Sequence, residues 1–332
     1  MSARRRILPI FVPHAGCPND CVFCNQKRIS GSLLPASAET VRSRLSELPE
    51  DAHCELAFYG GSFTAIDPVL REELLAAVRP FLERGTVDRI RVSTRPDAVD
   101  REVLASLRSA GVTTVELGAQ SMSDRVLRLS GRGHTSADTA RAAALVKEAG
   151  FTLILQMMTG LPGSGPSADI DTARKLIDLR PDGVRIYPTV VVRDTALETL
   201  WRSGRYREHT VEDAVEVCAK ILPLFEAASI PVIRLGLNPT DELSGGAAAA
   251  GAYHPALGEL VRSRVLRERA ERLLLRDPPK GPAALEVSRR DYSAMIGRRR
   301  ENVLWLRERF PEAGLRVRSA DVPDGTVRVV PL

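Results

Sequence analysis

Three cysteines lie within eight residues near the amino terminus, in the segment HAGCPNDCVFCNQ. Cys17, Cys21 and Cys24 have the spacing C-x3-C-x2-C. Thiolates are the usual ligands of iron–sulfur clusters, and three of them can hold three irons of a [4Fe–4S] cube. A ferredoxin that only transfers electrons supplies a fourth cysteine. A three-cysteine loop therefore predicts a cluster with one iron open to a further ligand.

A structural zinc site is the competing interpretation of this loop. Zinc takes four ligands, and His14 or a distant cysteine could complete the set. The remaining cysteines, Cys54 and Cys218, lie in apolar segments and are expected to be buried, unreactive thiols. Five cysteines with three clustered do not fit a secreted disulfide scaffold, which spreads and pairs its cysteines.

The bulk properties of the 332-residue chain set limits on its class. No apolar run approaches the roughly 20 residues of a membrane span. The basic and then apolar start, MSARRRILPIFVPH, is too short and too interrupted for a signal peptide. We therefore expect a cytoplasmic protein without a membrane partner. The net charge of +5 comes mostly from Arg, which suits phosphate or carboxylate contacts but equally reflects GC-rich coding.

Short apolar runs alternate with amphipathic stretches over the first two thirds of the chain. This alternation predicts strand–helix units and a parallel sheet covered by helices. We predict an α/β fold, a partial (β/α)6-type TIM barrel over residues 1–236 with a mixed α/β C-terminal extension over 237–332. The expected strands are 7–14, 55–59, 90–94, 114–118, 152–157 and 183–188, and the expected helices are 37–48, 69–82, 101–110, 136–149, 169–179 and 211–228.

The C-terminal extension has a different composition. SGGAAAAGAYHP predicts a loop, followed by a helix over 255–275, a Pro-rich linker, a basic helix over 289–310 and a terminal pair of strands. Tyr292 and Trp305 lie among arginines of the basic helix, a mixture that suits phosphate contact and base stacking. The alternative is a solvated amphipathic helix whose apolar face is Met295, Val303, Leu304 and Leu306.

Glycines and polar residues occur at the end of each expected strand, which is where chemistry sits in such sheets. Gly60 and Gly61 allow close backbone approach to a ligand. Glu116 is a carboxylate inside an apolar strand and is costly to bury without a partner. His134 either reaches the same site or packs against the fold. The candidate residues at the strand ends are Gly60, Gly61, Ser62, Ser93, Arg95, Glu116, Gln120, Arg132, Gln156, Gly160 and Tyr187.

Taken together, these motifs resemble the radical S-adenosylmethionine superfamily. C-x3-C-x2-C with Phe23 before the last cysteine is similar to its cluster loop, and GGS at 60–62 is similar to its Gly-Gly-Glu motif. The resemblance implies that the three cysteines bind a [4Fe–4S] cluster whose open iron binds S-adenosylmethionine. It also implies reductive cleavage of that cofactor to a 5′-deoxyadenosyl radical, with a reductant such as flavodoxin or ferredoxin. Phe23 and the strand-end residues would then be the cofactor contacts, and no residue is singled out as catalytic.

From about residue 7 to 206 the sequence is most similar to the radical domain of the Elongator catalytic subunit and its short bacterial relatives. The shared segments are FYGGSF, STRPD, ELGAQS, RGHT, GLPG and RIYPTVVVRDTALETLWRSGRY. This implies a tRNA or rRNA nucleoside as substrate. The sequence departs from Elongator in its shorter cysteine spacing and in lacking an acetyltransferase domain. The alternatives are a radical oxidoreductase acting on a small carboxylated molecule such as a porphyrinogen, and a non-catalytic cluster carrier.

Overall fold

The computed structural model describes residues 6–12, 15–18, 20–25, 36–49 and 52–332. His14, the possible zinc ligand, lies outside the described residues. Within them, no helix combines the length and the apolar character needed to cross a membrane.

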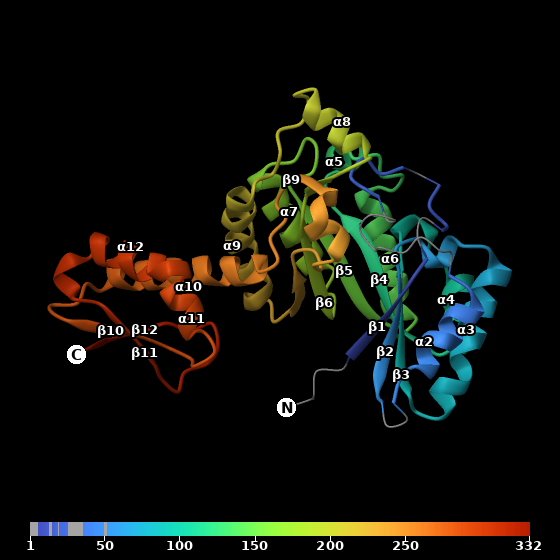
Figure 1. The fold of residues 1–332 in the computed structure, drawn as a ribbon, viewed down its shortest axis with the longest axis horizontal. Coiled ribbons are helices and arrows are strands. Elements are labelled where there is room, and N and C mark those ends of the chain that lie inside the picture. Colours follow the sequence, from blue (N-terminus) through green and yellow to red (C-terminus); the bar gives the residue numbers. More distant parts are fainter. Residues whose placement is uncertain (1–5, 13–14, 19, 26–35, 50–51) are drawn as a thin grey trace.

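Seven parallel strands form one curved sheet in the order β1-β2-β3-β4-β5-β6-β8 (Figure 1). Because β1 and β8 stand at opposite ends of this order, the barrel is open between them. The predicted partial barrel is confirmed, and a seventh strand, β8, extends it. The strands are β1 (Arg6–Phe11), β2 (Cys54–Tyr59), β3 (Val87–Thr94), β4 (Val112–Gln120), β5 (Thr152–Thr159), β6 (Gly183–Pro188) and β8 (Val232–Leu235).

Helices cover the outer face of this sheet (Figure 1). Ser37, Asp67 and Asp100 cap the starts of α2, α3 and α4 by accepting backbone N–H bonds. Thr135 and Thr210 form capping boxes with acidic residues three positions later. The long helices are α2 (Ala38–Ser46), α3 (Pro68–Glu83), α4 (Arg101–Ser109), α6 (Ser136–Glu148), α7 (Pro166–Asp178) and α9 (Val211–Ala227), with shorter α5 (Asp124–Leu129) and α8 (Ala196–Arg202).

The two faces of the sheet differ in polarity. Apolar residues such as Leu56, Val92 and Leu117 are fully buried in the core. The alternate positions Arg91 and Glu116 are polar and line an interior cavity. Successive strand residues point to opposite faces, so polar side chains of β3, β4 and β6 face the cavity while their chain neighbours face the core. A TIM-barrel interior is normally filled by branched apolar side chains. In this chain, by contrast, the inner face of the sheet carries polar side chains and lines a cavity.

A long helix, α10 (Leu257–Arg276), joins the barrel to a second core (Figure 1). Its first half packs into the barrel core through Leu257 and Val261, and its second half packs into a separate core through Leu266 and Leu274. We call residues 266–332 the C-terminal module. In this module β10 (Ala283–Val287) pairs in parallel with β11 (Arg316–Ser319) and antiparallel with β12 (Arg328–Pro331). The domain boundary after residue 236 stays a prediction.

Four expectations for the extension are wrong in detail. The basic helix is two helices, α11 (Tyr292–Ile296) and α12 (Glu301–Arg309), because Gly297, Arg299 and Arg300 adopt positive φ. The terminal strands flank β10 instead of pairing with each other. The Gly/Ala-rich loop contains β9 (Ala248–Gly251), which pairs with β7 (Val190–Val192). The predicted apolar face of the basic helix is incomplete, since Leu304 is 55% exposed.

Candidate active site

A cavity of about 1020 Å³ extends from the carboxyl ends of the strands down the inner face of the sheet. It is lined by Cys17, Cys21 and Cys24 and by residues of every strand of the sheet. The strand residues include Pro9 of β1, Tyr59 of β2, Ser93 of β3, Glu116 of β4, Gln156 of β5, Tyr187 of β6 and Ile233 of β8.

The cavity brings together ten of the twelve candidate residues from the sequence. These are Phe23, Gly60, Gly61, Ser93, Arg95, Glu116, Gln120, Arg132, Gln156 and Tyr187. The other two, Ser62 and Gly160, do not line it. The Ser62 hydroxyl is buried 2.8 Å from the Thr94 hydroxyl and accepts the Arg95 backbone N–H at 3.2 Å. Ser62 therefore connects two strand ends beneath the cavity wall.

Gly160 belongs to a polar network behind the cavity. Its N–H donates to Asp169 Oδ2 at 3.0 Å, and its carbonyl accepts from the Tyr206 hydroxyl at 2.7 Å. A side chain at this position would collide with the His209 ring. Burial raises the pKa of Asp169 to about 6, against the hydrogen bonds from Ser164 and Gly160 that lower it. This network fixes the GLPG turn that follows β5.

The cysteine loop is hydrogen-bonded to the barrel on both of its sides. The Val12 N–H donates to Tyr59 O at 2.7 Å, and the Ser62 N–H donates to Ala15 O at 2.9 Å. On the other side of the loop, the Val22 N–H donates to Ser130 O at 3.0 Å. Gly61 makes the first attachment possible, because a Cβ there would lie 2.5 Å from Val12 O and would clash with the Ala15 carbonyl.

Gly61→Ala is therefore expected to lower the free energy of unfolding by about 1–3 kcal/mol, because backbone atoms cannot make room for the methyl group. It should also lower the iron content after anaerobic reconstitution. Gly165→Ala is the matched control, since nothing lies within 4 Å of a Cβ there. Urea unfolding and iron assays compare the two. Equal stability and equal iron loading would contradict this account of Gly61.

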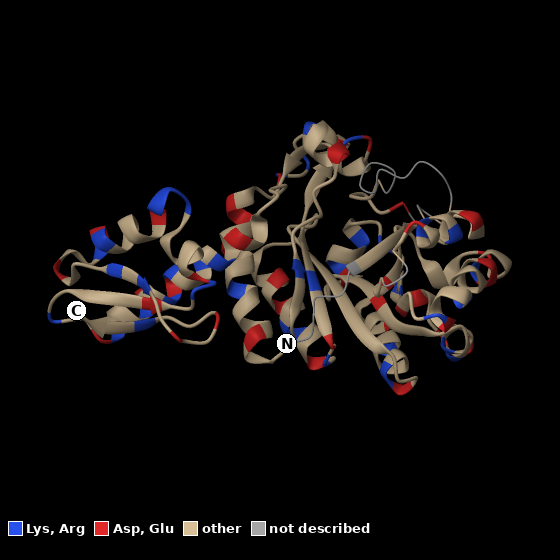
Figure 2. Cartoon of the chain, turned by 60° about the horizontal axis from the view of Figure 1, so that its bottom comes forward, with Lys and Arg blue, Asp and Glu red and all other residues tan. Residues whose placement is uncertain are grey.

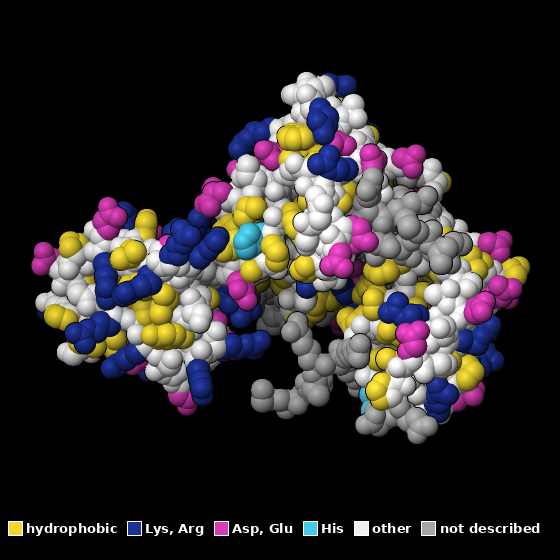
Figure 3. All heavy atoms as spheres, in the orientation of Figure 1, with side chains coloured by type: hydrophobic (Ala, Val, Ile, Leu, Met, Phe, Trp, Pro, Cys, Tyr) yellow, Lys and Arg dark blue, Asp and Glu magenta, His cyan; other side chains and the backbone are white. Residues whose placement is uncertain are grey.

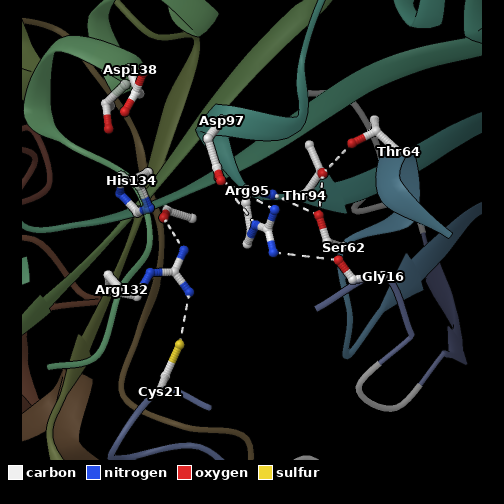
Figure 4. Close-up of polar contacts among 12 residues, drawn as sticks. Gly16, Cys21, Ser62, Thr64, Thr94, Arg95, Asp97, Arg132, His134 and Asp138 are labelled. Carbon is white, nitrogen blue, oxygen red and sulfur yellow. Dashed lines mark hydrogen bonds and ion pairs between the residues drawn. The ribbon is translucent and has the colours of Figure 1, made fainter. Parts of the chain in front are cut away.

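Two guanidinium groups flank the cysteine loop (Figure 4). Arg132 Nη1 donates to Cys21 Sγ at 3.3 Å, and its Nη2 donates to Gly118 O at 2.8 Å. Arg95 forms a bidentate pair with Asp97, with both N–O distances at 3.1 Å. Burial raises the pKa of Cys17, and the nearby charges of Arg95 and Arg132 oppose this effect. The two guanidinium groups therefore place positive charge beside the three cysteines.

His134 packs beneath this site and does not line the cavity. Its Nε2 lies 3.1 Å from Ala119 O, and the residue is almost fully buried. Burial, together with the nearby Arg132 charge, lowers the pKa of His134 to about 4. The imidazole is consequently neutral near pH 7 and has a packing role, which was one of the two roles that the sequence left open.

The floor of the cavity holds a buried chain of charges that the sequence analysis only partly found. Arg91 makes a bidentate pair with Glu55, with N–O distances of 2.8 and 3.1 Å. Glu116 Oε2 lies 3.5 Å from Arg91 Nη1 and 3.0 Å from Arg185 Nε. Glu116 is 1% exposed, so these two cations offset the cost of burying its charge. The sequence analysis did not identify Arg91 and Arg185. Both lie at strand positions that face the cavity, as Glu116 and Tyr187 do.

Arg185 also connects this chain to two tyrosines. Its Nη2 donates to Tyr59 Oη at 2.6 Å and its Nη1 donates to Tyr187 Oη at 3.1 Å. Burial alone would lower the pKa of Arg185, but Glu116 and the tyrosines raise it overall. Burial, reinforced by Glu116, raises the pKa of Tyr59 above its ordinary value. Arg185 is therefore charged and both phenols are protonated at neutral pH.

The residues at the mouth fit an iron–sulfur cluster, because thiolates are its usual protein ligands. A cubane places each of three thiolates on a different iron. The three cysteines line one cavity, and that cavity is large enough for a cofactor of drug size beside them.

A partial parallel barrel with three cysteines in the loop after its first strand is typical of one class of enzyme. Residues 11–176, half of the chain, match the Radical SAM superfamily, and residues 181–267 match the Radical SAM C-terminal domain. The chain belongs to the radical S-adenosylmethionine superfamily and is an enzyme of that class. Members of the superfamily use a [4Fe–4S] cluster and S-adenosylmethionine.

Within that superfamily the chain is similar to Elongator proteins. It is 28% identical over 289 residues to Elongator complex protein 3 of Mus musculus, covering 77% of this chain and 52% of that protein. It is 28% identical over 276 residues to tRNA uridine(34) acetyltransferase of Dehalococcoides mccartyi, covering 69% of this chain and 60% of that protein. The chain thus spans about half the length of these relatives.

The fold also matches a solved structure, the archaeal Methanocaldococcus infernus Elp3 with an N-terminal deletion. The TM-score is 0.64 at 22% identity, over 80% of this chain and 64% of that chain. This likeness supports the partial barrel independently of the sequence motifs.

Proposed function

We propose that Cys17, Cys21 and Cys24 hold a [4Fe–4S] cluster, that the cavity binds S-adenosylmethionine, and that the enzyme modifies a nucleoside of tRNA. When bound, the cluster and S-adenosylmethionine supply a 5′-deoxyadenosyl radical by one-electron cleavage of the sulfonium bond. Arg132 donates a hydrogen bond to Cys21 and orients its sulfur. Gly60 and Gly61 offer backbone groups to the cofactor, and Ser93, Gln120 and Gln156 offer side-chain hydrogen bonds.

The names of the relatives support the choice of RNA, because one of them is a tRNA uridine(34) acetyltransferase. The charge distribution of this chain is the observation that carries the proposal. The C-terminal module has 15 Lys or Arg against 10 Asp or Glu, a net charge of +5. That equals the net charge of the whole chain, so residues 1–265 are balanced. Lys and Arg are spread over the helices and loops of the module (Figures 2 and 3).

Several of these cations are available to a polyanion. Within the described residues, the exposed side chains without a carboxylate partner include Arg272, Arg289 and the run Arg298, Arg299 and Arg300. Arg299 and Arg300 have φ values of 50° and 66°, which are unfavourable for residues with a side chain. This turn presents three neighbouring arginines at the surface between α11 and α12. Such a cluster is suited to phosphate contacts.

Trp305 contributes less to stacking than the sequence suggested. Its ring lies between two guanidinium groups, with Arg267 at 4.8 Å and Arg309 at 5.6 Å from the ring centroid. Trp305 also packs against the core of the module. These contacts favour phosphate binding over base stacking on α12.

The pairing of the cavity arginines disfavours the carboxylated-substrate alternative. Arg91 and Arg185 pair with Glu55 and Glu116, and Arg95 pairs with Asp97. Arg132 and Arg234 donate to backbone carbonyls, which orient these cations without cancelling their charge. The three arginines that are already paired with carboxylates gain little from a further anion such as a porphyrinogen carboxylate. The floor of the cavity, where Arg91 and Arg185 lie, therefore suits a neutral substrate group better.

The test is anaerobic incubation of reconstituted, dithionite-reduced enzyme with S-adenosylmethionine, with and without bulk tRNA. We expect 5′-deoxyadenosine to form, and its yield to rise with tRNA alongside a mass change in a tRNA nucleoside. Formation of 5′-deoxyadenosine that tRNA does not affect, without any nucleoside change, would refute the RNA substrate. Absence of 5′-deoxyadenosine under all conditions would instead support a cluster carrier.

The triple variant Arg298→Ala/Arg299→Ala/Arg300→Ala is expected to bind bulk tRNA more weakly at low salt. The slope of log affinity against log salt should become shallower by about two, because each lost phosphate contact removes roughly 0.7–0.9. Filter binding from low to moderate salt measures both effects. The control replaces Arg42, Arg79 and Arg89, three exposed arginines on the barrel, with alanine. Equal slopes for the two triple variants would exclude the turn as a contact site.

A further inference from the structure

Tyr59 and Tyr187 meet across the inner face of the barrel at one guanidinium. They belong to β2 and β6, which are separated by three strands in the sheet order. Arg185 donates from different nitrogens to the two phenol oxygens, at 2.6 and 3.1 Å. Glu116 holds Arg185 from the other side, with Oε2 3.0 Å from its Nε. The position of both hydroxyl groups is therefore fixed by charged, buried residues.

The direction of these hydrogen bonds decides what the tyrosines can do. A guanidinium can only donate, so both phenol oxygens act as acceptors toward Arg185. Each O–H proton must then point elsewhere. Among the described residues, neither hydroxyl donates a hydrogen bond to a protein acceptor, and each one accepts from Arg185. Both tyrosines line the cavity, so two O–H donors are available to a ligand there.

The electrostatics of the floor restrict the ligand to a neutral acceptor. Glu55 and Glu116 balance Arg91 and Arg185, so an anion gains little from these cations. Two O–H donors held by one guanidinium match in number the two lone pairs of one carbonyl oxygen. We propose that Tyr59 and Tyr187 form a carbonyl subsite, oriented by Arg185, that binds a lactam oxygen of the substrate. Its assignment to a nucleobase rests on the proposed function, whereas its preference for a neutral carbonyl does not.

The surrounding side chains suit a flat ring that carries such a carbonyl. Phe11 of β1 lies beside Tyr59, with 6.5 Å between ring centroids. Ile7 of β1 and Ile233 of β8 line the cavity from the two ends of the sheet, and each is 38% exposed. Tyr187 packs in the same apolar cluster as Phe23 of the cysteine loop. A base that enters between β1 and β8 would thus have apolar walls and two donors beneath the cysteine loop.

The experiment measures binding of uridine and adenosine to cluster-loaded enzyme saturated with S-adenosylmethionine, by titration calorimetry. Uridine has ring carbonyls and adenosine has none. We expect wild-type enzyme to bind uridine about tenfold more tightly, since one or two hydrogen bonds differ. Tyr59→Phe and Tyr187→Phe should each weaken uridine binding about threefold to tenfold and leave adenosine unchanged. Tyr253→Phe, whose hydroxyl contacts Ser244 away from the cavity, is the control.

Equal binding of the two nucleosides by wild-type enzyme would overturn the carbonyl subsite, and binding of neither would overturn its assignment to a nucleobase. A uridine preference that survives both Phe substitutions would also overturn the carbonyl subsite. A uridine preference lost in both variants supports the subsite even if tRNA does not stimulate turnover, in which case only the proposed RNA substrate fails. Thermal unfolding of each variant, with a midpoint close to wild type, shows that lost affinity does not come from misfolding.

Discussion

Cys21→Ala is expected to reduce 5′-deoxyadenosine formation to background and to remove the visible iron–sulfur absorbance. Two remaining thiolates can hold only two of the four irons, so a stable cube cannot form. Cys21 also accepts from Arg132 at 3.3 Å, and alanine leaves that guanidinium without its sulfur partner. Iron and sulfide content, electron paramagnetic resonance of the reduced protein and 5′-deoxyadenosine yield measure the loss. Cys17→Ala and Cys24→Ala should behave in the same way.

The two cysteines outside the loop serve as controls for this result. Cys54 in β2 and Cys218 in α9 are buried, as predicted from the sequence, and neither lines the cavity. Burial raises the pKa of Cys218 to about 12, which keeps it a thiol. Cys54→Ala and Cys218→Ala should cost about 1 kcal/mol of stability each and retain the cluster. Retention of the cluster in Cys21→Ala with its loss in Cys54→Ala would disprove the ligand assignment.

The placement of the site could be predicted because it depends on local patterns. Parallel strands place their carboxyl ends at one edge, so Gly60, Arg95 and Gln120 were expected near the cysteines. The expectation that Glu116 has a partner followed from the cost of burying a carboxylate. Its partners could not be chosen, because Arg91 and Arg185 reach it from neighbouring and more distant strands. That choice depends on the curvature and stagger of the sheet, which a single strand does not encode.

The C-terminal module shows a second limit of predicting the structure from the sequence. Gly297 signals a break, yet the apolar residues Met295, Val303 and Leu306 continue a helical spacing across it, and the sequence therefore predicted one helix. The structure instead places Arg299 and Arg300 in the left-handed region, a conformation that side chains disfavour. Surrounding contacts such as those from Asn302 to Ser263 hold α12 in place beyond the break. Tertiary contacts decide the chain path here, and local propensity does not reveal them.

Arg185→Met is expected to lower the free energy of unfolding by about 3–5 kcal/mol at neutral pH. Methionine preserves much of the buried volume but removes one of the two cations beside Glu116, together with the donors to Tyr59 and Tyr187. Arg91 cannot compensate fully, because it is 3.5 Å from Glu116 and is already paired with Glu55. Urea unfolding monitored by circular dichroism gives the change. In thermal unfolding the midpoint should fall by roughly 10 °C.

A double variant separates an unpaired charge from a packing defect. In Arg185→Met the buried Glu116 carboxylate loses one of its two neighbouring cations. Glu116→Gln/Arg185→Met removes the unpaired charge and should recover part of the lost free energy of unfolding. A pure cavity effect would not be relieved by Glu116→Gln.

An exposed ion pair supplies the matched comparison for this buried one. Arg101 Nη2 lies 2.9 Å from Glu148 Oε2, and both side chains are largely exposed. Arg101→Met should therefore cost less than about 1 kcal/mol, since water already solvates both charges. The two substitutions remove the same chemical group at similar distances from a carboxylate, and they differ mainly in burial. If Arg185→Met costs no more than Arg101→Met, Glu116 is not held by Arg185, and the orientation of Tyr59 and Tyr187 then needs another source.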